Sequence, residues 1–167
     1  YKFRQDSTFL YFWGVDEPCF AAILDLDNAT ECLYGNDVDI DDIIWMGPQP
    51  SVASKGAAIG CAATAPLAEF FKAVAAALEA GRSVHFLPPA RYYNQMTLAE
   101  LTGIPASQVR KVAPMAADGG KHASEELVKS VVALRLIKED CEIVEMDYAA
   151  DLGYQMHTEA RRGCKPG

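Results

Sequence analysis

The chain has 167 residues, half of them apolar and 23% charged, which is typical of a folded domain and excludes a disordered segment. Its 15 Lys and Arg against 23 Asp and Glu give a net charge of −8. Because neutralising phosphates requires a surplus of basic residues, this charge argues against a nucleic-acid-binding protein. Its apolar runs are all shorter than the ~20 residues needed to cross a membrane, so we expect neither nucleic acid nor membrane as a partner.

The first fifty residues predict a helix, a hairpin and a second helix. Ser7 can cap a short helix over 7–13, which a glycine ends. The strand-like runs 19–27 and 29–35 flank an Asp-Asn turn and so predict a β-hairpin. A short helix over 39–45 then begins at an aspartate and ends at the sequence "GPQP".

The middle of the chain predicts a strand–helix–strand unit. A helix over 66–81 has proline in its first turn and glycine just past its end. The run "SVHFL" at 83–87 predicts a buried strand, and residues 59–62 would form the strand before the helix. A further helix is expected over 91–103, followed by a short helix and edge segment over 105–114.

Two helices close the chain. Ser124 is predicted to cap the first of them. The second covers 139–162 and carries a stripe of small residues that includes Ala150, Gly153 and Ala160. Strands alternating with amphipathic helices after an opening hairpin indicate an α/β domain with a mixed β-sheet flanked by helices.

The run "NDVDIDD" resembles a calcium loop because Asp37, Asp39 and Asp41 alternate in it. Such a loop needs glycine at its sixth position and glutamate at its twelfth, where this chain has Asp42 and Pro48. A solvated, helix-capping acidic run is therefore the favoured interpretation.

No other motif predicts an active site. "GAAIG" at 56–60 lacks the lysine of a phosphate loop, so a helix end and turn is favoured. His157 and Glu159 match half of a zinc deaminase signature whose Pro-Cys-x-x-Cys half is absent, so His157 is expected to have a packing or capping role. His85 and His122 lack a Cys or carboxylate at ligand spacing. We therefore predict no catalytic residue and no metal ligand in this chain.

The five cysteines are scattered and form no CxxC pair, which favours reduced thiols in a cytoplasmic protein. They are Cys19, Cys32, Cys61, Cys141 and Cys164.

Four segments, in the right order, resemble the Xaa-Pro peptidase family. "FRQDSTFLYFWGVDEP" at 3–18 is similar to its Arg-Gln-x-Ser-x-Phe…Gly-x-x-x-Pro signature, and "IIWMG" at 43–47 to its Trp-x-Gly segment. "LRLIKEDCEI" at 134–143 resembles the junction before the catalytic domain, and "MHTEARRGCKPG" at 156–167 resembles the start of that domain.

The resemblance implies a creatinase/prolidase N-terminal domain with an RNase H-like motif. It divides the chain into a non-catalytic N-terminal domain at 1–138 and, at 139–167, the first helix leading into a "pita-bread" catalytic domain. That domain would hold two divalent metal ions, usually manganese, on two aspartates, a histidine and two glutamates beyond residue 167. A helix and a strand are expected before the Arg-Gln motif.

The implied activity is hydrolysis of the bond before proline in peptides, and an aminopeptidase P is favoured over a prolidase, which cuts Xaa-Pro dipeptides. This chain would shape substrate access and build a homo-oligomer, without being active alone. A free-standing scaffold domain remains an alternative, as does a nuclease of RNase H type, although neither its carboxylate cluster nor its basic face is evident. Within the domain, Trp45 is predicted to rim the active site or an interface, with a core tryptophan as the alternative, and Arg4 to pair with an internal carboxylate or carbonyl.

Overall fold

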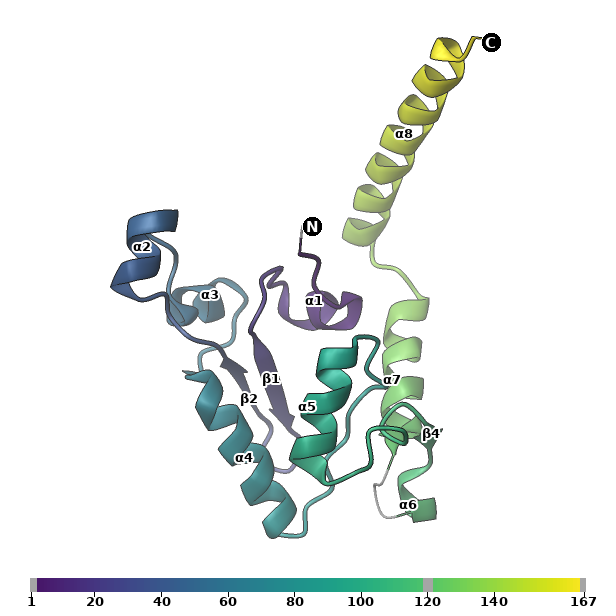
Figure 1. The fold of residues 1–167 in the computed structure, drawn as a ribbon. Coiled ribbons are helices and arrows are strands. Elements are labelled where there is room, and N and C mark those ends of the chain that lie inside the picture. The colour runs from purple at the N-terminus through teal and green to yellow at the C-terminus, as the bar shows by residue number, and fades with distance from the viewer. Residues whose placement is uncertain (1–2, 119–121, 166–167) are drawn as a thin grey trace. The chain divides into compact units, whose positions relative to one another are not determined.

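The computed structural model describes residues 3–118 and 122–165, and Figure 1 shows its helices and strands. The chain divides into two compact units, residues 1–127 and 128–167, and each is described by itself. The elements in chain order are α1 (Ser7–Trp13), β1 (Ala21–Asp25), β2 (Thr30–Tyr34), α2 (Ile40–Met46), α3 (Val52–Ala58), β3 (Thr64–Ala65), α4 (Leu67–Glu79), α5 (Tyr92–Thr102), β4 (Val112–Ala113), α6 (Met115–Asp118), β5 (Ala123–Ser124), α7 (Glu125–Leu136) and α8 (Asp140–Gly163).

The first unit contains a mixed three-stranded sheet in which β2 lies between β1 and β3. β1 and β2 form the predicted antiparallel hairpin. β3 runs parallel to β2, with Leu33 opposite Thr64 and Tyr34 opposite Ala65. A second, parallel pair joins β4 and β5. The predicted α/β class with a mixed sheet flanked by helices is therefore confirmed.

The two strands predicted around α4 are wrong. The strand before α4 is β3 at 64–65. Residues 59–62, which were predicted to form that strand, form the turn that ends α3. Residues 83–87 belong to no helix or strand and have no ladder partner among the described residues. Phe86 is nevertheless buried, and its carbonyl accepts a hydrogen bond from the Ser124 amide at 3.1 Å. The apolar pattern thus reported burial and not strand pairing.

Helices were predicted more accurately than strands. The first helix is confirmed, although Asp6 and not Ser7 caps it: its Oδ1 accepts from the amides of Thr8 and Phe9 at 2.9 and 3.1 Å. Ser124 caps α7 as predicted, since its hydroxyl accepts from the Leu127 amide at 3.1 Å. The helices predicted over 39–45, 66–81, 91–103 and 139–162 are all present.

Two clusters of buried apolar side chains form the core of the first unit. One joins the sheet to α1 and α3 and consists of Trp13, Val15, Leu33, Val52 and Cys61. The other consists of Phe86, Ile104, Val109 and Ala123. The elements that carry the first cluster also position the residues between β2 and α3.

Helix α3 was not predicted as a separate helix, and its glycine explains how it turns back onto the sheet. The carbonyl of Gly56 accepts hydrogen bonds from the amides of Ile59 and Cys61, at 3.2 and 2.9 Å, which close the helix end. A Cβ at Gly56 would lie 2.6 Å from Thr64 Cγ2 and 2.8 Å from the Cys61 carbonyl oxygen. The close approach of α3 to β3 therefore requires glycine here.

An ion-pair cluster joins the end of α4 to the hairpin turn. The guanidinium of Arg82 donates to both carboxylate oxygens of Asp25, at 2.9 and 2.6 Å, and to Asp27 at 2.8 Å. These hydrogen bonds from Arg82, and then one from Asn28, hold the pKa of Asp25 well below its usual range. The same two aspartates raise the pKa of Arg82.

The second unit contains the remainder of α7 and the 24-residue helix α8. A capping box begins α8, since the Glu139 side chain accepts from the Glu142 amide and the Glu142 side chain accepts from the Glu139 amide. Between Ile143 and Met156, α8 exposes several large apolar side chains, among them Val144 and Tyr154. Within the described part of the chain, no helix combines the length and apolarity needed to span a membrane.

Replacing Gly56 with alanine is expected to lower the free energy of unfolding by about 1–3 kcal/mol, because backbone atoms would have to move to accommodate the methyl group. Gly153→Ala, inside α8, is the matched control, since no heavy atom lies within 4 Å of its added Cβ. The control should be neutral or stabilising by up to about 1 kcal/mol. Urea unfolding of both variants tests this, and equal effects would contradict the close approach of α3 to β3.

The lowered pKa of Asp25 predicts a pH-dependent contribution to stability. Because this carboxyl is more acidic in the folded chain than in the unfolded one, its stabilisation is complete above about pH 4–5 and is lost as the pH falls through the folded-state pKa. Asp25→Asn should therefore be less stable than wild type at pH 7, and the difference should shrink toward pH 2. Asp151→Asn on exposed α8 changes the net charge equally and is the control for urea unfolding at each pH. A difference that stays constant with pH would exclude this role for Asp25.

Candidate functional site on α2

The acidic run before α2 caps helices. Asp39 Oδ1 accepts from the Asp42 amide at 2.8 Å and so caps α2. Asp37 Oδ1 accepts from the amide of Val52, the first residue of α3, at 2.6 Å. The helix-capping interpretation is thus confirmed, and the resemblance to a calcium loop is explained by the demand for N-terminal acceptors.

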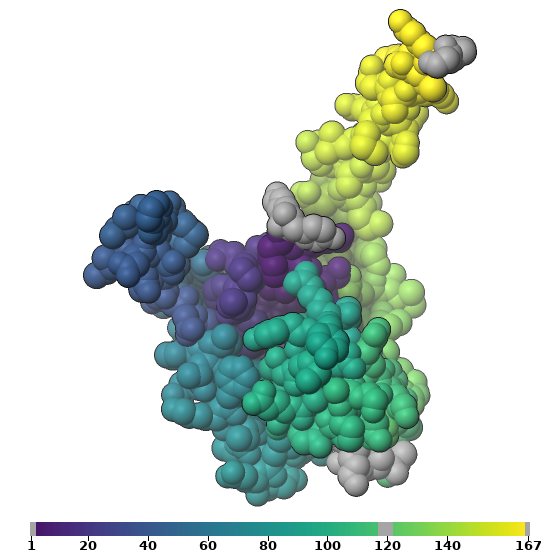
Figure 2. All heavy atoms as spheres, in the orientation of Figure 1, coloured from purple at the N-terminus to yellow at the C-terminus, as the bar shows by residue number. Residues whose placement is uncertain are grey.

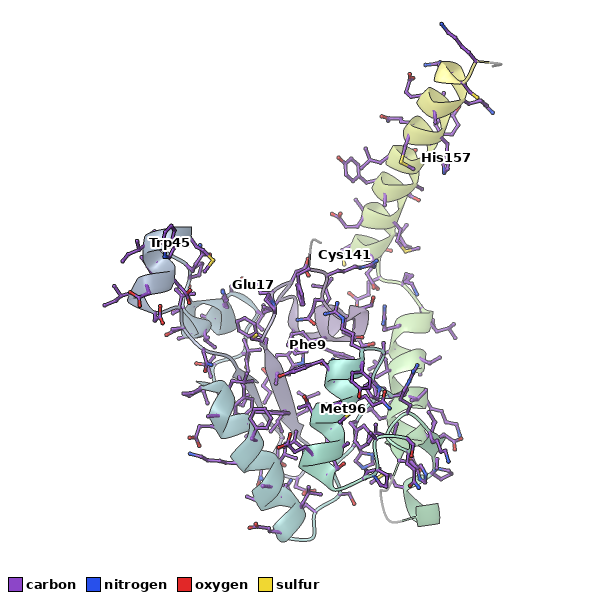
Figure 3. All side chains as sticks on the ribbon, in the orientation of Figure 1. Phe9, Glu17, Trp45, Met96, Cys141 and His157 are labelled. Carbon is purple, nitrogen blue, oxygen red and sulfur yellow. The ribbon has the colours of Figure 1, made fainter. Side chains whose placement is uncertain are left out.

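Helix α2 is exposed over its whole length. All seven residues are solvent-exposed, and among the apolar side chains the largest exposed fractions belong to Trp45 at 87%, Ile40 at 76% and Ile44 at 71%. Figure 2 shows the blue atoms of this region as a projection on the surface of the first unit. Trp45 lies on α2, apart from β1 and β2, in Figure 3. The alternative of a core tryptophan at this position is therefore wrong.

The surface of α2 combines apolar side chains with carboxylates. We call it the α2 patch and define it by Ile40, Ile44, Trp45 and Met46, with Asp41 and Asp42 in the first turn. An exposed indole can stack on a proline ring or on another aromatic ring, and the neighbouring branched side chains add apolar area. The patch suits an apolar partner such as a peptide side chain or another protein surface.

The Arg-Gln motif has a structural role, but through the glutamine. Arg4 is exposed, and its side chain forms neither an ion pair nor a hydrogen bond within residues 3–118 and 122–165, so the predicted pairing with an internal carboxylate or carbonyl is wrong. Its carbonyl accepts from the guanidinium of Arg91. Gln5 instead holds the loop after α1: its amide donates to Asp16 Oδ1 at 2.9 Å and its Nε2 to the Glu17 carbonyl at 2.8 Å.

His85 belongs to a polar cluster with the composition of a Ser–His–Glu triad but without its geometry. His85 Nδ1 lies 2.8 Å from Ser124 Oγ, and that hydroxyl donates to Glu126 at 3.0 Å. Ser124 is fully buried and caps α7, so its hydroxyl is unavailable as a nucleophile. Hydrogen bonds from its own backbone amide, then from Ser124 and the Met115 amide, lower the pKa of Glu126.

The remaining polar candidates do not assemble into a site. His157 is exposed on α8, and Glu159 pairs with Arg162 at 2.6 Å, so the expected packing role of His157 is not observed. Burial raises the pKa of the Cys61 thiol, which favours its unreactive, protonated form. No group of three His, Cys, Asp or Glu side chains within residues 3–118 and 122–165 is arranged to hold a metal ion.

The comparisons with known proteins identify the family. The family description "Aminopeptidase P, N-terminal domain" matches residues 1–85. A solved structure, "Proline aminopeptidase P II from Yersinia pestis", is similar to this chain with a TM-score of 0.72 at 19% sequence identity. Comparison with curated protein sequences gives no significant match.

The chain is therefore an α/β domain of the kind found at the N-terminus of Xaa-Pro peptidases. It belongs to the aminopeptidase P N-terminal domain family, as the sequence motifs predicted. The similarity to the Yersinia structure covers all of this chain and 38% of that one, so the chain spans well under half of that protein's length. The matched region includes α1, the hairpin, α2 and the Trp45 segment.

The exposure of Trp45 predicts that it contributes little to stability. Trp45→Ala should change Tm by no more than about 1 °C, because surface substitutions have small effects. Trp13→Ala is the contrasting variant: Trp13 is only 7% exposed, and truncating a buried aromatic costs about 3–5 kcal/mol, or roughly 10 °C in Tm. A thermal melt in which Trp45→Ala loses more than about 4 °C would contradict the exposed position of this side chain.

Proposed function

We propose that this chain acts as the non-catalytic N-terminal domain of an Xaa-Pro aminopeptidase that hydrolyses the peptide bond before proline. In this proposal residues 1–138 form the domain and 139–167 lead into a catalytic domain. Family membership supports it, and so do the many apolar side chains that α8 exposes, which suit a further packing partner.

The proposed reaction explains why a dedicated enzyme is needed. The nitrogen of the bond before proline carries no hydrogen, so proteases that bind substrates as a β-strand lose a main-chain contact there. The described residues do not fit a two-metal centre, because no three of their His, Cys, Asp or Glu side chains lie together so as to hold a metal ion. In our proposal two divalent ions, manganese by preference, belong to the catalytic domain, and we assign no hydrolytic step to this chain.

The contribution of this domain would come from the α2 patch. Trp45, exposed beside Ile44 and Met46, is proposed to rim the active site of the same subunit or of a neighbouring one. There it would contact peptide residues beyond the scissile bond and so select peptides longer than Xaa-Pro. The same apolar surface supports a homo-oligomer. The five free thiols support a cytoplasmic location.

The carrying observation is the almost complete exposure of an indole on a helix that buries none of its own residues. Exposed tryptophan is uncommon because this side chain gains most from burial, so an exposed one indicates a binding surface. Its segment lies inside the part of the chain that matches the family.

The test uses the full-length enzyme that carries this domain. Trp45→Ala should raise KM for peptides of three or more residues about 5- to 10-fold with little change in kcat, because a lost stacking contact costs about 1–1.5 kcal/mol of binding. Xaa-Pro dipeptides should be unaffected. Leu26→Ala is the control, since this residue is equally exposed on the hairpin turn.

The outcomes separate the candidate enzymes. Hydrolysis restricted to Xaa-Pro dipeptides would identify a prolidase and remove the proposed role in selecting longer peptides. An unchanged KM in Trp45→Ala would show that the α2 patch does not contact substrate. The 167-residue chain alone, incubated with manganese, should show no chelator-sensitive turnover.

A further inference from the structure

The position of α2 requires an explanation, because packing does not provide one. A helix is normally held by its buried face, whereas all seven residues of α2 are exposed. The chain leaves the sheet at the end of β2 and reaches the start of α3 at its N-cap, Ser51, and we call residues 36–51 the α2 loop. What fixes Trp45 must therefore lie at the two ends of this loop.

Two adjacent side chains at the first end of the α2 loop bind two different helices. Asn36 Oδ1 accepts from the amide of Leu67, the first residue of α4, at 3.0 Å. Asp37 Oδ1 accepts from the amide of Val52, the first residue of α3, at 2.6 Å. Both amides are first-turn donors that have no partner within their own helix.

Neither helix can supply these acceptors itself. The N-cap residue of α4 is Pro66, which has no polar side chain. The N-cap of α3 is Ser51, whose hydroxyl already accepts from the Ser54 amide at 3.1 Å. A carboxylate at the start of α3 also interacts favourably with the helix dipole. The bonds from Asn36 and Asp37 therefore satisfy donors that would otherwise depend on water.

The bond of Asp37 also closes the α2 loop. Asp37 lies one residue inside its first end and Val52 one residue past its second, so the hydrogen bond joins the two ends. Asn36 then ties this closed base to α4. Backbone pairing ends immediately before them, at the bond from the Gly35 amide to the Ala65 carbonyl.

We infer that Asn36 and Asp37 are positioning residues for Trp45. By capping α4 and α3 they fix the base of the α2 loop and with it the direction in which α2 presents its indole. Their importance for peptide binding rests on the proposed function of Trp45, but their effect on the α2 loop does not.

The experiment measures the mobility of Trp45 in the 167-residue chain. The {1H}–15N heteronuclear NOE of the two indole groups is recorded, with Trp13 as the internal reference and Trp45→Phe to assign the signals. In Asn36→Ala, Asp37→Ala and the double variant, the NOE of the Trp45 indole should fall by about half or more as the loop gains nanosecond motion. The Trp13 value should stay unchanged.

Two matched variants separate positioning from general destabilisation. Ser51→Ala removes the cap that α3 makes for itself but leaves both bonds at the base of the α2 loop, so the Trp45 NOE should not change. Asp37→Asn keeps an oxygen acceptor and should retain the wild-type NOE. If the double variant fails to fold by circular dichroism, the single variants decide.

The inference is overturned if folded Asn36→Ala and Asp37→Ala retain the wild-type Trp45 NOE, or if Ser51→Ala lowers it equally. If Trp45→Ala leaves KM unchanged while Asn36→Ala and Asp37→Ala lower the Trp45 NOE, the proposed function is rejected and the positioning role stands. No substrate enters the NMR measurement, so the two hypotheses fail separately.

Discussion

The pairing of β2 on both edges is the constraint on which the first unit depends. β1 occupies one edge as a hairpin, and β3 occupies the other through the short parallel contact of Leu33 with Thr64. Leu33 is fully buried in the core with Trp13 and Val52, so strand pairing and core packing meet at one residue. Helices α1 and α3 depend on this strand for their packing, because their core residues Trp13 and Val52 share one buried cluster with Leu33.

The same strand determines where the candidate site lies. Backbone pairing stops at Gly35, and the next two residues turn their side chains to the first turns of α4 and α3. From this point the chain is held by side-chain caps and no longer by ladder hydrogen bonds. These caps anchor the loop that carries α2, a helix with no buried face. Each such hydrogen bond contributes only about 1 kcal/mol, so these caps anchor the base of the α2 loop weakly. Helix α2 itself stays exposed to solvent.

The sequence predicted what local rules determine. Glycine and proline located the ends of α2, α4 and α5, and two strand-like runs on either side of an Asp-Asn turn located the hairpin. The strand predicted over 83–87 is wrong because a buried segment without strand pairing has the same apolar pattern as a strand. Only the tertiary structure shows that Phe86 is buried there without a ladder partner in the described part of the chain. Helix α3 was missed because it is a single short helix with a glycine inside. The prominence of Trp45 came from the family motif, whereas its exposure could not be read from the sequence, which left core and surface equally open.

The acidic run shows why residue type alone does not define a site. Asp37, Asp39 and Asp41 have the spacing of metal ligands, yet Asp37 and Asp39 each accept a hydrogen bond from a backbone amide at the start of a helix. The signal that distinguishes the two uses lies outside the run: Val52 and Leu67 begin helices whose own caps are occupied or absent. Asn36 and Asp37 were therefore invisible as a pair until the helices they cap were placed, because a cap acting across 15 or 31 residues leaves no local pattern. A carboxylate that precedes a helix should accordingly be tested first against every nearby helix start, and only then as a ligand for a cation.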